Sequence, residues 1–141
     1  FTKLVKSKRL KCEVWGTDIS NVIIEADKIE NPYIIYLSQA IGGKNYVPDN
    51  YFDIVFSGEV IEHLEEPQTL FKDAYKALKK GGKLIITTPN DDHIKSNEHV
   101  WFFVKEDVKK LYEDNGFEKV KFIDLPDIEH VFVIFGIGKK K

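Results

Sequence analysis

The stretch from Phe52 to Asn90, FDIVFSGEVIEHLEEPQTLFKDAYKALKKGGKLIITTPN, decides the fold of this 141-residue chain. It opens within an apolar run, Tyr51 to Ser57, of the kind that forms a parallel strand covered on both faces. Pro67 then starts a segment with apolar residues at helical spacing, and Gly81-Gly82 ends it before a second apolar run, Lys83 to Thr88. We therefore expect a strand, a helix and a parallel strand, which is the repeating unit of α/β sheets.

Apolar spacing and turn residues predict further elements on either side of this unit. They are a short helix over Phe1 to Lys11, a strand over Cys12 to Thr17, a helix over residues 21–30, a strand over Tyr33 to Leu37, a helix over Lys105 to Asn115, and strands over Phe117 to Leu125 and His130 to Ile137. Four residues, Pro126 to Glu129, join the last two strands, whereas parallel strands need a connection of about a dozen residues. The sequence therefore predicts one α/β domain over residues 1–141, with a mostly parallel sheet that ends in an antiparallel hairpin.

The composition excludes several classes of partner. Lys and Arg number 21 against 23 Asp and Glu, so the net charge of −2 gives no overall field that would attract bulk DNA or an anionic membrane. No apolar run approaches the roughly 20 residues that span a bilayer, and the single cysteine, Cys12, cannot form an internal disulfide. The start of the chain has neither an initiator Met nor the apolar segment of a signal peptide. We expect a cytoplasmic protein whose chain is cut at Phe1.

The stretch from Phe52 to Asn90 resembles the middle of a class I S-adenosylmethionine-dependent methyltransferase, and the resemblance extends over nearly the whole chain. It implies a Rossmann-like sheet, S-adenosylmethionine as the cofactor, and methyl transfer to an oxygen or nitrogen of a small molecule or an RNA end. In that family a first strand and a glycine-rich G-x-G loop come before the segment that Cys12 to Thr17 resembles, and neither precedes it here. We therefore expect an N-terminally truncated domain with poor cofactor affinity.

The resemblance also implies which residues bind the ribose and adenine of the cofactor. Gly16 to Ser20, GTDIS, resembles the second-strand motif, in which Asp18, with Ile19 beside it, would accept hydrogen bonds from both ribose hydroxyls. The alternative is that Asp18 caps the following helix. Ser38 and Gln39 stand where the family usually carries an Asp-Ala pair that meets the adenine amino group. Gln39 is either a substitute acceptor or an ordinary loop residue.

Two further segments are expected to line the methionine end of the cofactor and the methyl acceptor. Ser57 and Gly58 fall at the methionine end, where a residue without a Cβ lets a ligand approach closely; the alternative is a tight turn after a strand. Trp101 to Phe103 lies in the loop region that tends to form the acceptor pocket in this family. We expect substrate contacts there, whereas most other aromatic residues are expected to pack in the core.

Glu59, Glu62 and His63 form the group most suggestive of chemistry. If this segment is helical, positions i, i+3 and i+4 share one face. Ubiquinone-biosynthesis O-methyltransferases and small-RNA 3′-terminal 2′-O-methyltransferases use a similar E-x-x-E-H, which implies a divalent ion such as Mg²⁺, with His99 or His93 as a further ligand. The alternative is a site without metal, in which Glu59 supports the loop and His63 is a general base, because histidine titrates near neutral pH.

The absent first strand has consequences for assembly and for function. In the family this strand lies between the second and fourth strands, so Cys12 to Thr17 and Tyr51 to Ser57 would each lack a partner here. The chain is then a fragment, or the two strands pair directly, or the exposed sheet edges form a dimer. The competing hypothesis on function is a methyltransferase-like binding module that is catalytically silent. A nicotinamide-dependent Rossmann enzyme is disfavoured by the antiparallel ending.

Overall fold

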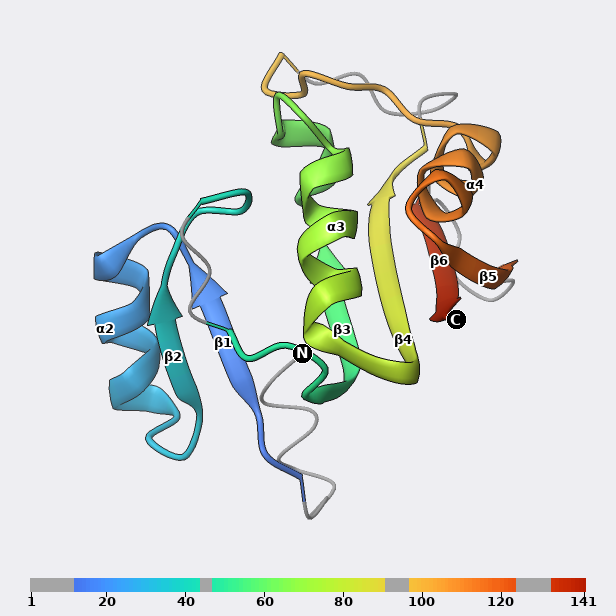
Figure 1. Ribbon diagram of the computed structural model, residues 1–141. Coiled ribbons are helices and arrows are strands. Elements are labelled where there is room, and N and C mark those ends of the chain that lie inside the picture. The colour runs from blue at the N-terminus through green and yellow to red at the C-terminus, as the bar shows by residue number, and fades with distance from the viewer. Residues whose placement is uncertain (1–11, 44–46, 91–96, 124–132) are drawn as a thin grey trace. The chain divides into compact units, whose positions relative to one another are not determined.

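The structure, a computed structural model, describes residues 12–43, 47–90, 97–123 and 133–141 (Figure 1). It divides into two compact units, Phe1–Tyr46 and Val47–Lys141. The helix predicted over Phe1 to Lys11 lies outside the described residues, and the single domain over residues 1–141 stays a prediction. Within the described part of the chain, no helix is long and apolar enough to cross a membrane.

The first unit contains two parallel strands and the helix that connects them. Strand β1 (Trp15–Asp18) pairs with β2 (Ile35–Ser38), and α2 (Asn21–Glu30) lies between them in the chain (Figure 1). α2 buries Ile24, which is 3% exposed. Because the strands are parallel, their carboxyl ends meet at one edge of the pair, as in open α/β sheets.

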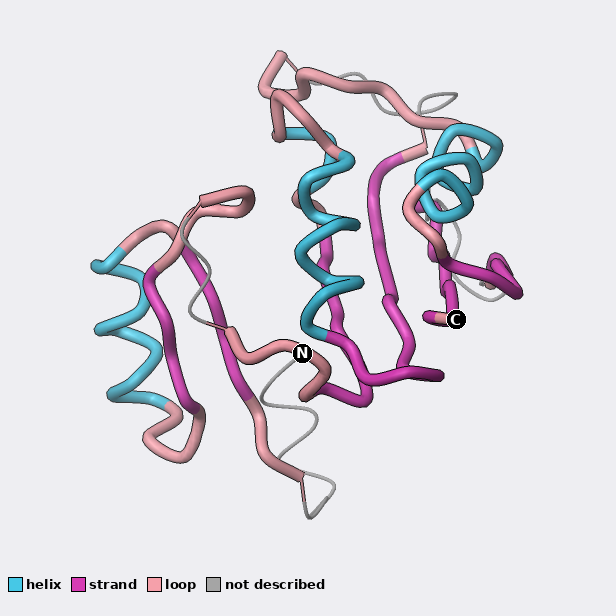
Figure 2. The backbone as a smooth tube through the Cα atoms, in the orientation of Figure 1, coloured by secondary structure: helices cyan, strands magenta, loops and turns pink. Residues whose placement is uncertain are grey.

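The second unit contains a four-stranded sheet in the order β3-β4-β6-β5 (Figure 2). Its strands are β3 (Phe52–Gly58), β4 (Leu78–Pro89), β5 (Phe117–Phe122) and β6 (Val133–Lys140). β3 and β4 are parallel, whereas β6 is antiparallel to both β4 and β5. The predicted Rossmann-like α/β class, with parallel strands leading into an antiparallel C-terminal pair, is therefore confirmed. The short turn predicted between the last two strands lies outside the described residues.

Two helices, α3 (Gln68–Ala77) and α4 (Lys105–Asp114), pack on this sheet, and a short 3-10 helix, η1 (Ile61–His63), follows β3. The core of the unit consists of Ile61, Leu70, Phe71, Ala74, Leu78, Leu84, Ile86, Phe103, Val108, Tyr112, Phe117 and Ile134. Burying each large side chain in it stabilises the fold by roughly 1.5–3 kcal/mol. The core lies between the helices and β4. It includes Ile61 and Phe103, so it also fixes the segments that follow β3 and β4.

The end of α3 differs from the prediction. The helix ends at Ala77, and β4 already begins at Leu78, four residues before Gly82. In the pairing of β3 with β4, Phe52 lies opposite Leu78 and Ile54 lies opposite Lys83, so residues 79–82 form an irregular bulge. Gly81 has a φ of +81°, which a glycine adopts without strain. The glycine pair therefore shapes a bulge in the strand and does not terminate the helix.

The two strand edges that were expected to lack partners are found in separate sheets. In the described residues β1 has β2 as its partner, and β3 has β4. β1 and β3 belong to different units, and their direct pairing stays a prediction. The pairing of an edge with another chain stays a prediction.

Tyr112 of α4 lies over a stretch of β6 that carries glycine at two positions. Its hydroxyl is 3.2 Å from the carbonyl oxygen of Leu84 and 2.9 Å from that of Gly136, and burial raises the pKa of the phenol. A Cβ on Gly136 would lie 3.0 Å from Cε2 of Tyr112, and a Cβ on Gly138 would lie 2.7 Å from Cε1 and overlap Cδ1. The tyrosine therefore fits only because this face of β6 has no side chains at these positions.

Gly138→Ala is expected to lower the free energy of unfolding by about 1–3 kcal/mol, because the new methyl group overlaps the Tyr112 ring. Urea unfolding of four proteins measures the coupling energy between the two positions: the wild type, Gly138→Ala, Tyr112→Ala and the double variant. With the ring removed, the same substitution should cost little. An equal cost in both backgrounds would contradict this explanation.

Candidate functional site

In the first unit, two strand ends bring the predicted ribose and adenine residues to one edge. Asp18 is paired with Ser38 in the register of β1 and β2, and the N–H of Gln39 donates to the carbonyl of Asp18 at 3.0 Å. The hydroxyl of Ser38 is 3.5 Å from the carbonyl oxygen of Ile19, which is 75% exposed. The structure thus brings Asp18, Ile19, Ser38 and Gln39 together, while their binding of a cofactor stays a prediction.

One oxygen of the Asp18 carboxylate is used within the chain. Oδ1 accepts the N–H of Ser20 at 2.7 Å. Ser20 is the N-cap of α2, with its hydroxyl accepting from the N–H of Ile23 at 3.4 Å, so Asp18 is not the helix cap. In the described residues no hydrogen-bond partner is found for Oδ2 of Asp18. This oxygen is available to accept from a hydroxyl group of a ligand.

In the second unit, the condition that Glu59, Glu62 and His63 share one helical face is not met. Only Ile61–His63 forms a short 3-10 helix, and Glu59 lies outside it with a φ of +53°. The reason is local: the N–H of Glu59 donates to the carbonyl of Thr87 at 2.9 Å, which holds the residue beside β4. A backbone conformation that disfavours ordinary side chains is often retained where it positions a functional group.

Gly58 is required by its own neighbours. A Cβ at this position would lie 2.9 Å from Cζ of Phe56 and 3.0 Å from the hydroxyl oxygen of Thr87. The missing side chain is thus explained by packing at the end of β3, which is neither of the two predicted reasons. Ser57 and Gly58 do lie at the carboxyl end of a parallel strand, where a ligand is expected, and their contact with the cofactor stays a prediction.

Glu62 carries a buried carboxylate that is only half satisfied. The residue is 1% exposed, and its Oε2 accepts the hydroxyl of Thr88 at 2.9 Å. Oε1 is buried and has no hydrogen-bond partner among the residues that the structure describes. The backbone carbonyl of Glu62 accepts the N–H groups of Val100 and Trp101 at 2.8 and 3.1 Å. A buried, unpaired carboxylate oxygen is costly, so this site suits a proton donor or a cation.

The imidazole of His63 lies with Nε2 near Oε1 of Glu62. Nδ1 lies 3.0 Å from the carbonyl oxygen of Glu98, and a carbonyl can only accept, so Nδ1 carries the hydrogen. In the neutral imidazole, Nε2 is then an acceptor, and it lies 3.8 Å from Oε1 of Glu62. The ring of His99 lies with its centroid 5.1 Å from that of His63. Ligand atoms of Glu62, His63 and His99 all lie within 4.8 Å of one another.

This group contains three of the four predicted metal ligands, and Glu59 is not a member. His93, the other candidate, lies outside the described residues. Partial burial raises the pKa of Glu59; a hydrogen bond from Thr87 opposes this, and the charge of Glu62 adds to it. Glu59 therefore lies close enough to Glu62, His63 and His99 for their charges to affect its pKa. Its carboxyl group, however, is hydrogen-bonded to Thr87 of β4.

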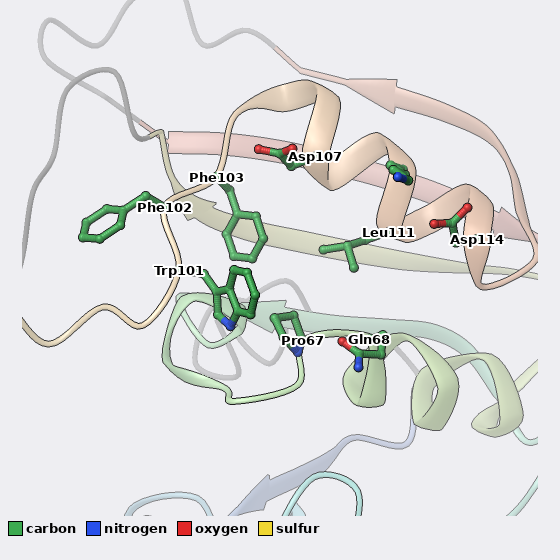
Figure 3. A pocket seen from close by; sticks show the side chains of 9 residues that line it. Pro67, Gln68, Trp101, Phe102, Phe103, Asp107, Leu111 and Asp114 are labelled. Carbon is green, nitrogen blue, oxygen red and sulfur yellow. The ribbon is translucent and has the colours of Figure 1, made fainter.

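A pocket of about 400 Å³ lies at the predicted acceptor segment. It is lined by Pro67, Gln68, Trp101, Phe102, Phe103, Asp107, Lys110, Leu111 and Asp114. Figure 3 shows the rings of Trp101 and Phe103 side by side, with Phe102 pointing away from them. The indole N–H of Trp101 donates to the carbonyl of Leu64 at 2.9 Å, which fixes the ring against the segment of Glu62. Whether this pocket takes the methyl acceptor stays a prediction.

Thr87 and Thr88 were not among the residues predicted for the site. Both contact its carboxylates, Thr87 at Glu59 and Thr88 at Glu62. Two threonines at the carboxyl end of an otherwise apolar strand are a weak signal, because hydroxyl groups also occur in ordinary strands. The partner that gives the hydroxyl of Thr88 its role lies 26 residues away in the chain, and that of Thr87 is similarly distant.

Comparisons of the chain with known proteins give matches to methyltransferases. A family model described as a methyltransferase domain matches residues 1–86. Phosphoethanolamine N-methyltransferase 3 of Arabidopsis thaliana is 35% identical over 94 residues, covering 60% of this chain and 19% of the plant protein. The mitochondrial ubiquinone biosynthesis O-methyltransferase of Candida albicans is 29% identical over 124 residues, covering 82% of this chain and 36% of the yeast protein. This chain thus spans only part of the length of these relatives.

A solved structure shows the same fold. It is phosphoethanolamine N-methyltransferase 2 of Haemonchus contortus in complex with phosphomonomethylethanolamine and S-adenosylhomocysteine. The likeness has a TM-score of 0.73 at 16% identity, and it covers 98% of this chain and 46% of that one. At this sequence identity, the likeness shows that the two chains share a fold, but it does not show that they share a methyl acceptor.

The raised pKa of Glu59 predicts a pH-dependent stability difference. A carboxyl group whose pKa is higher in the folded chain stabilises it below the unfolded pKa and loses that contribution as pH rises through the folded pKa. Glu59→Gln should therefore gain in unfolding free energy relative to the wild type between pH 4 and pH 7, as measured in urea. Exposed Glu65→Gln is the control and should show no such trend; a difference for Glu59→Gln that stays constant or reverses would contradict the pKa direction.

Proposed function

This chain belongs to the class I S-adenosylmethionine-dependent methyltransferase family, and we propose that it is part of an enzyme that methylates an oxygen or nitrogen of a small molecule. The observation that carries the proposal is the meeting of Asp18 and Ser38 at the carboxyl ends of two parallel strands, with one carboxylate oxygen available. That is where an open α/β sheet binds its ligand. Membership of the family supplies the identity of the cofactor.

The residues present suit the cofactor. In the first unit, Oδ2 of Asp18 would accept from a ribose hydroxyl, while Ile19, Ser38 and Gln39 would contact the adenosine. In the second unit, Ser57 and Gly58 would contact the methionine part. S-adenosylmethionine, when bound, supplies a methyl group made electrophilic by the attached sulfonium. The protein then has to hold the acceptor in place and remove its proton.

His63 is proposed as the general base. Its Nδ1–H is held by the carbonyl of Glu98, so Nε2 has the lone pair that can take a proton from an acceptor hydroxyl or ammonium group. The resulting imidazolium would face the unpaired Oε1 of Glu62, which would stabilise its charge. Glu59 would supply a second carboxylate, in addition to that of Glu62, near the imidazole of His63. The backbone contact thus sets the tautomer of the neutral imidazole.

A divalent ion at Glu62, His63 and His99 is the second candidate arrangement. It is favoured by the unpaired buried Oε1 and by the close spacing of the three ligand atoms. A ligating imidazole typically donates its other N–H to a carbonyl, as His63 does. Two imidazoles and one carboxylate suit Zn²⁺ or Mn²⁺ better than Mg²⁺, which prefers oxygen ligands. Such an ion would orient and acidify an acceptor hydroxyl.

A small acceptor is favoured over an RNA end. The chain has a net charge of −2, and the pocket at Trp101 is lined by two aspartates and one lysine, so neither offers the positive surface that a phosphate backbone requires. The named relatives are methyltransferases of phosphoethanolamine and of ubiquinone biosynthesis. We propose that the acceptor binds in the pocket lined by Pro67 and Trp101.

Asp18→Asn is expected to weaken the binding of S-adenosylhomocysteine about tenfold, because a hydrogen bond to a charged acceptor is replaced by one to a neutral acceptor. Isothermal titration of the chain measures this, against a wild-type affinity that we expect to be weaker than low micromolar. Glu25→Gln, the same charge change on α2, is the control and should bind as the wild type does. Equal affinities for all three chains would remove Asp18 from the cofactor site.

The metal arrangement predicts that the chain binds one equivalent of Zn²⁺ and that Glu62→Gln weakens this binding at least tenfold, since a ligand charge is lost. Titration with Zn²⁺ in a non-coordinating buffer gives the affinity, and Glu65→Gln is the charge-matched control. If the wild type binds no more Zn²⁺ than Glu62→Gln does, the ion is absent from this site. His63 then stands as a general base alone.

A further inference from the structure

Thr88 is a buried polar residue that neither the base nor the metal arrangement uses. It lies near the carboxyl end of β4 and is 0% exposed, and its hydroxyl donates to Oε2 of Glu62 at 2.9 Å. A valine would have nearly the same shape without the cost of burying a hydroxyl group. The hydroxyl therefore has to be explained by what it does to Glu62.

Glu62 joins three segments of the second unit. Its side chain is bonded to Thr88, and its backbone carbonyl accepts from the N–H groups of Val100 and Trp101. The next residue, His63, is bonded through Nδ1 to the carbonyl of Glu98. A displacement of Glu62 would therefore move both the imidazole group and the loop that carries Trp101.

We propose that Thr88 is a positioning residue, which acts through Glu62 to hold His63, His99 and the Trp101 loop in one arrangement. With Oε2 held on the Thr88 hydroxyl, Oε1 is left 3.8 Å from Nε2 of His63. Without the hydroxyl, neither oxygen of the buried carboxylate has a donor within the described part of the chain, and the side chain is expected to turn toward water. The inference deepens the proposed function and rests on it for the chemistry of the group, but the arrangement can be measured without cofactor or acceptor.

Two substitutions separate the hydroxyl from the methyl group of Thr88. Thr88→Val keeps the shape and removes the donor, whereas Thr88→Ser keeps the donor and opens a small cavity. A residue that only fills space would make both variants disturb the site in proportion to their loss of stability. A positioning residue makes the valine variant alone disturb it, with serine restoring the wild-type arrangement.

NMR of the complete chain without added ligand reports this arrangement. The informative signals are the imidazoles of His63 and His99 and the indole N–H of Trp101, which donates to the carbonyl of Leu64. Thr88→Val should shift or broaden these signals, and Thr88→Ser should leave them in place. In a Zn²⁺ titration, Thr88→Val should weaken binding about tenfold and Thr88→Ser by less than about threefold, because partners that orient metal ligands have effects of this size.

Urea unfolding of both variants gives the stability against which the site signals are compared. Equal disturbance in the two variants, or unchanged signals in Thr88→Val, would overturn the inference. If the wild type binds no Zn²⁺, the metal arrangement fails and the NMR comparison still decides the role of Thr88. If the wild type fails to bind S-adenosylhomocysteine, the proposed function fails, and the role of Thr88 is again judged by the NMR signals alone.

Discussion

The buried carboxylate of Glu62 is the constraint on which the arrangement of the second unit's site depends. A charge at 1% exposure is tolerated only if hydrogen bonds or a counter-charge replace the lost water. Thr88 satisfies one oxygen, and the other has no donor within the described residues. The missing partner must carry positive charge or a hydrogen, which a protonated His63 and a divalent ion both provide. The general base and the metal arrangement are therefore two answers to one electrostatic requirement.

The fold meets this requirement by placing β4 between a parallel and an antiparallel neighbour. Its carboxyl end delivers Thr87 and Thr88 beside the segment that follows β3. The other side of β4 pairs with β6, whose glycine positions admit the Tyr112 ring of α4. Since overpacking there would displace α4, the same packing also fixes the wall of the pocket that contains Leu111. Core packing and site geometry are thus coupled through one strand.

Periodicity predicted most helices and strands, because apolar spacing reports which face is buried. It does not report structure that backbone hydrogen bonds decide. A helix after β3 would place Glu59, Glu62 and His63 on one face, but Glu59 takes a left-handed conformation that its bond to Thr87 holds. Motif resemblance singled out Asp18, His63 and Glu62 as candidates, and their roles stay predictions. It could not find Thr88, since a threonine at a strand end has no distinctive neighbours in the sequence, and its carboxylate partner is visible only after folding.

The loop that carries Trp101 is bonded to Glu62 through backbone groups. Two N–H groups, those of Val100 and Trp101, share one carbonyl, so this attachment does not depend on which side chains the loop carries there. Val100 is 57% exposed and is open to substitution, whereas Trp101, at 45%, also donates its indole N–H to the carbonyl of Leu64. If this loop contacts the acceptor, as we propose, acceptor choice can vary with its side chains while the imidazole group stays in place. Such a separation of a fixed chemical group from a variable loop is one way in which a single fold serves many acceptors.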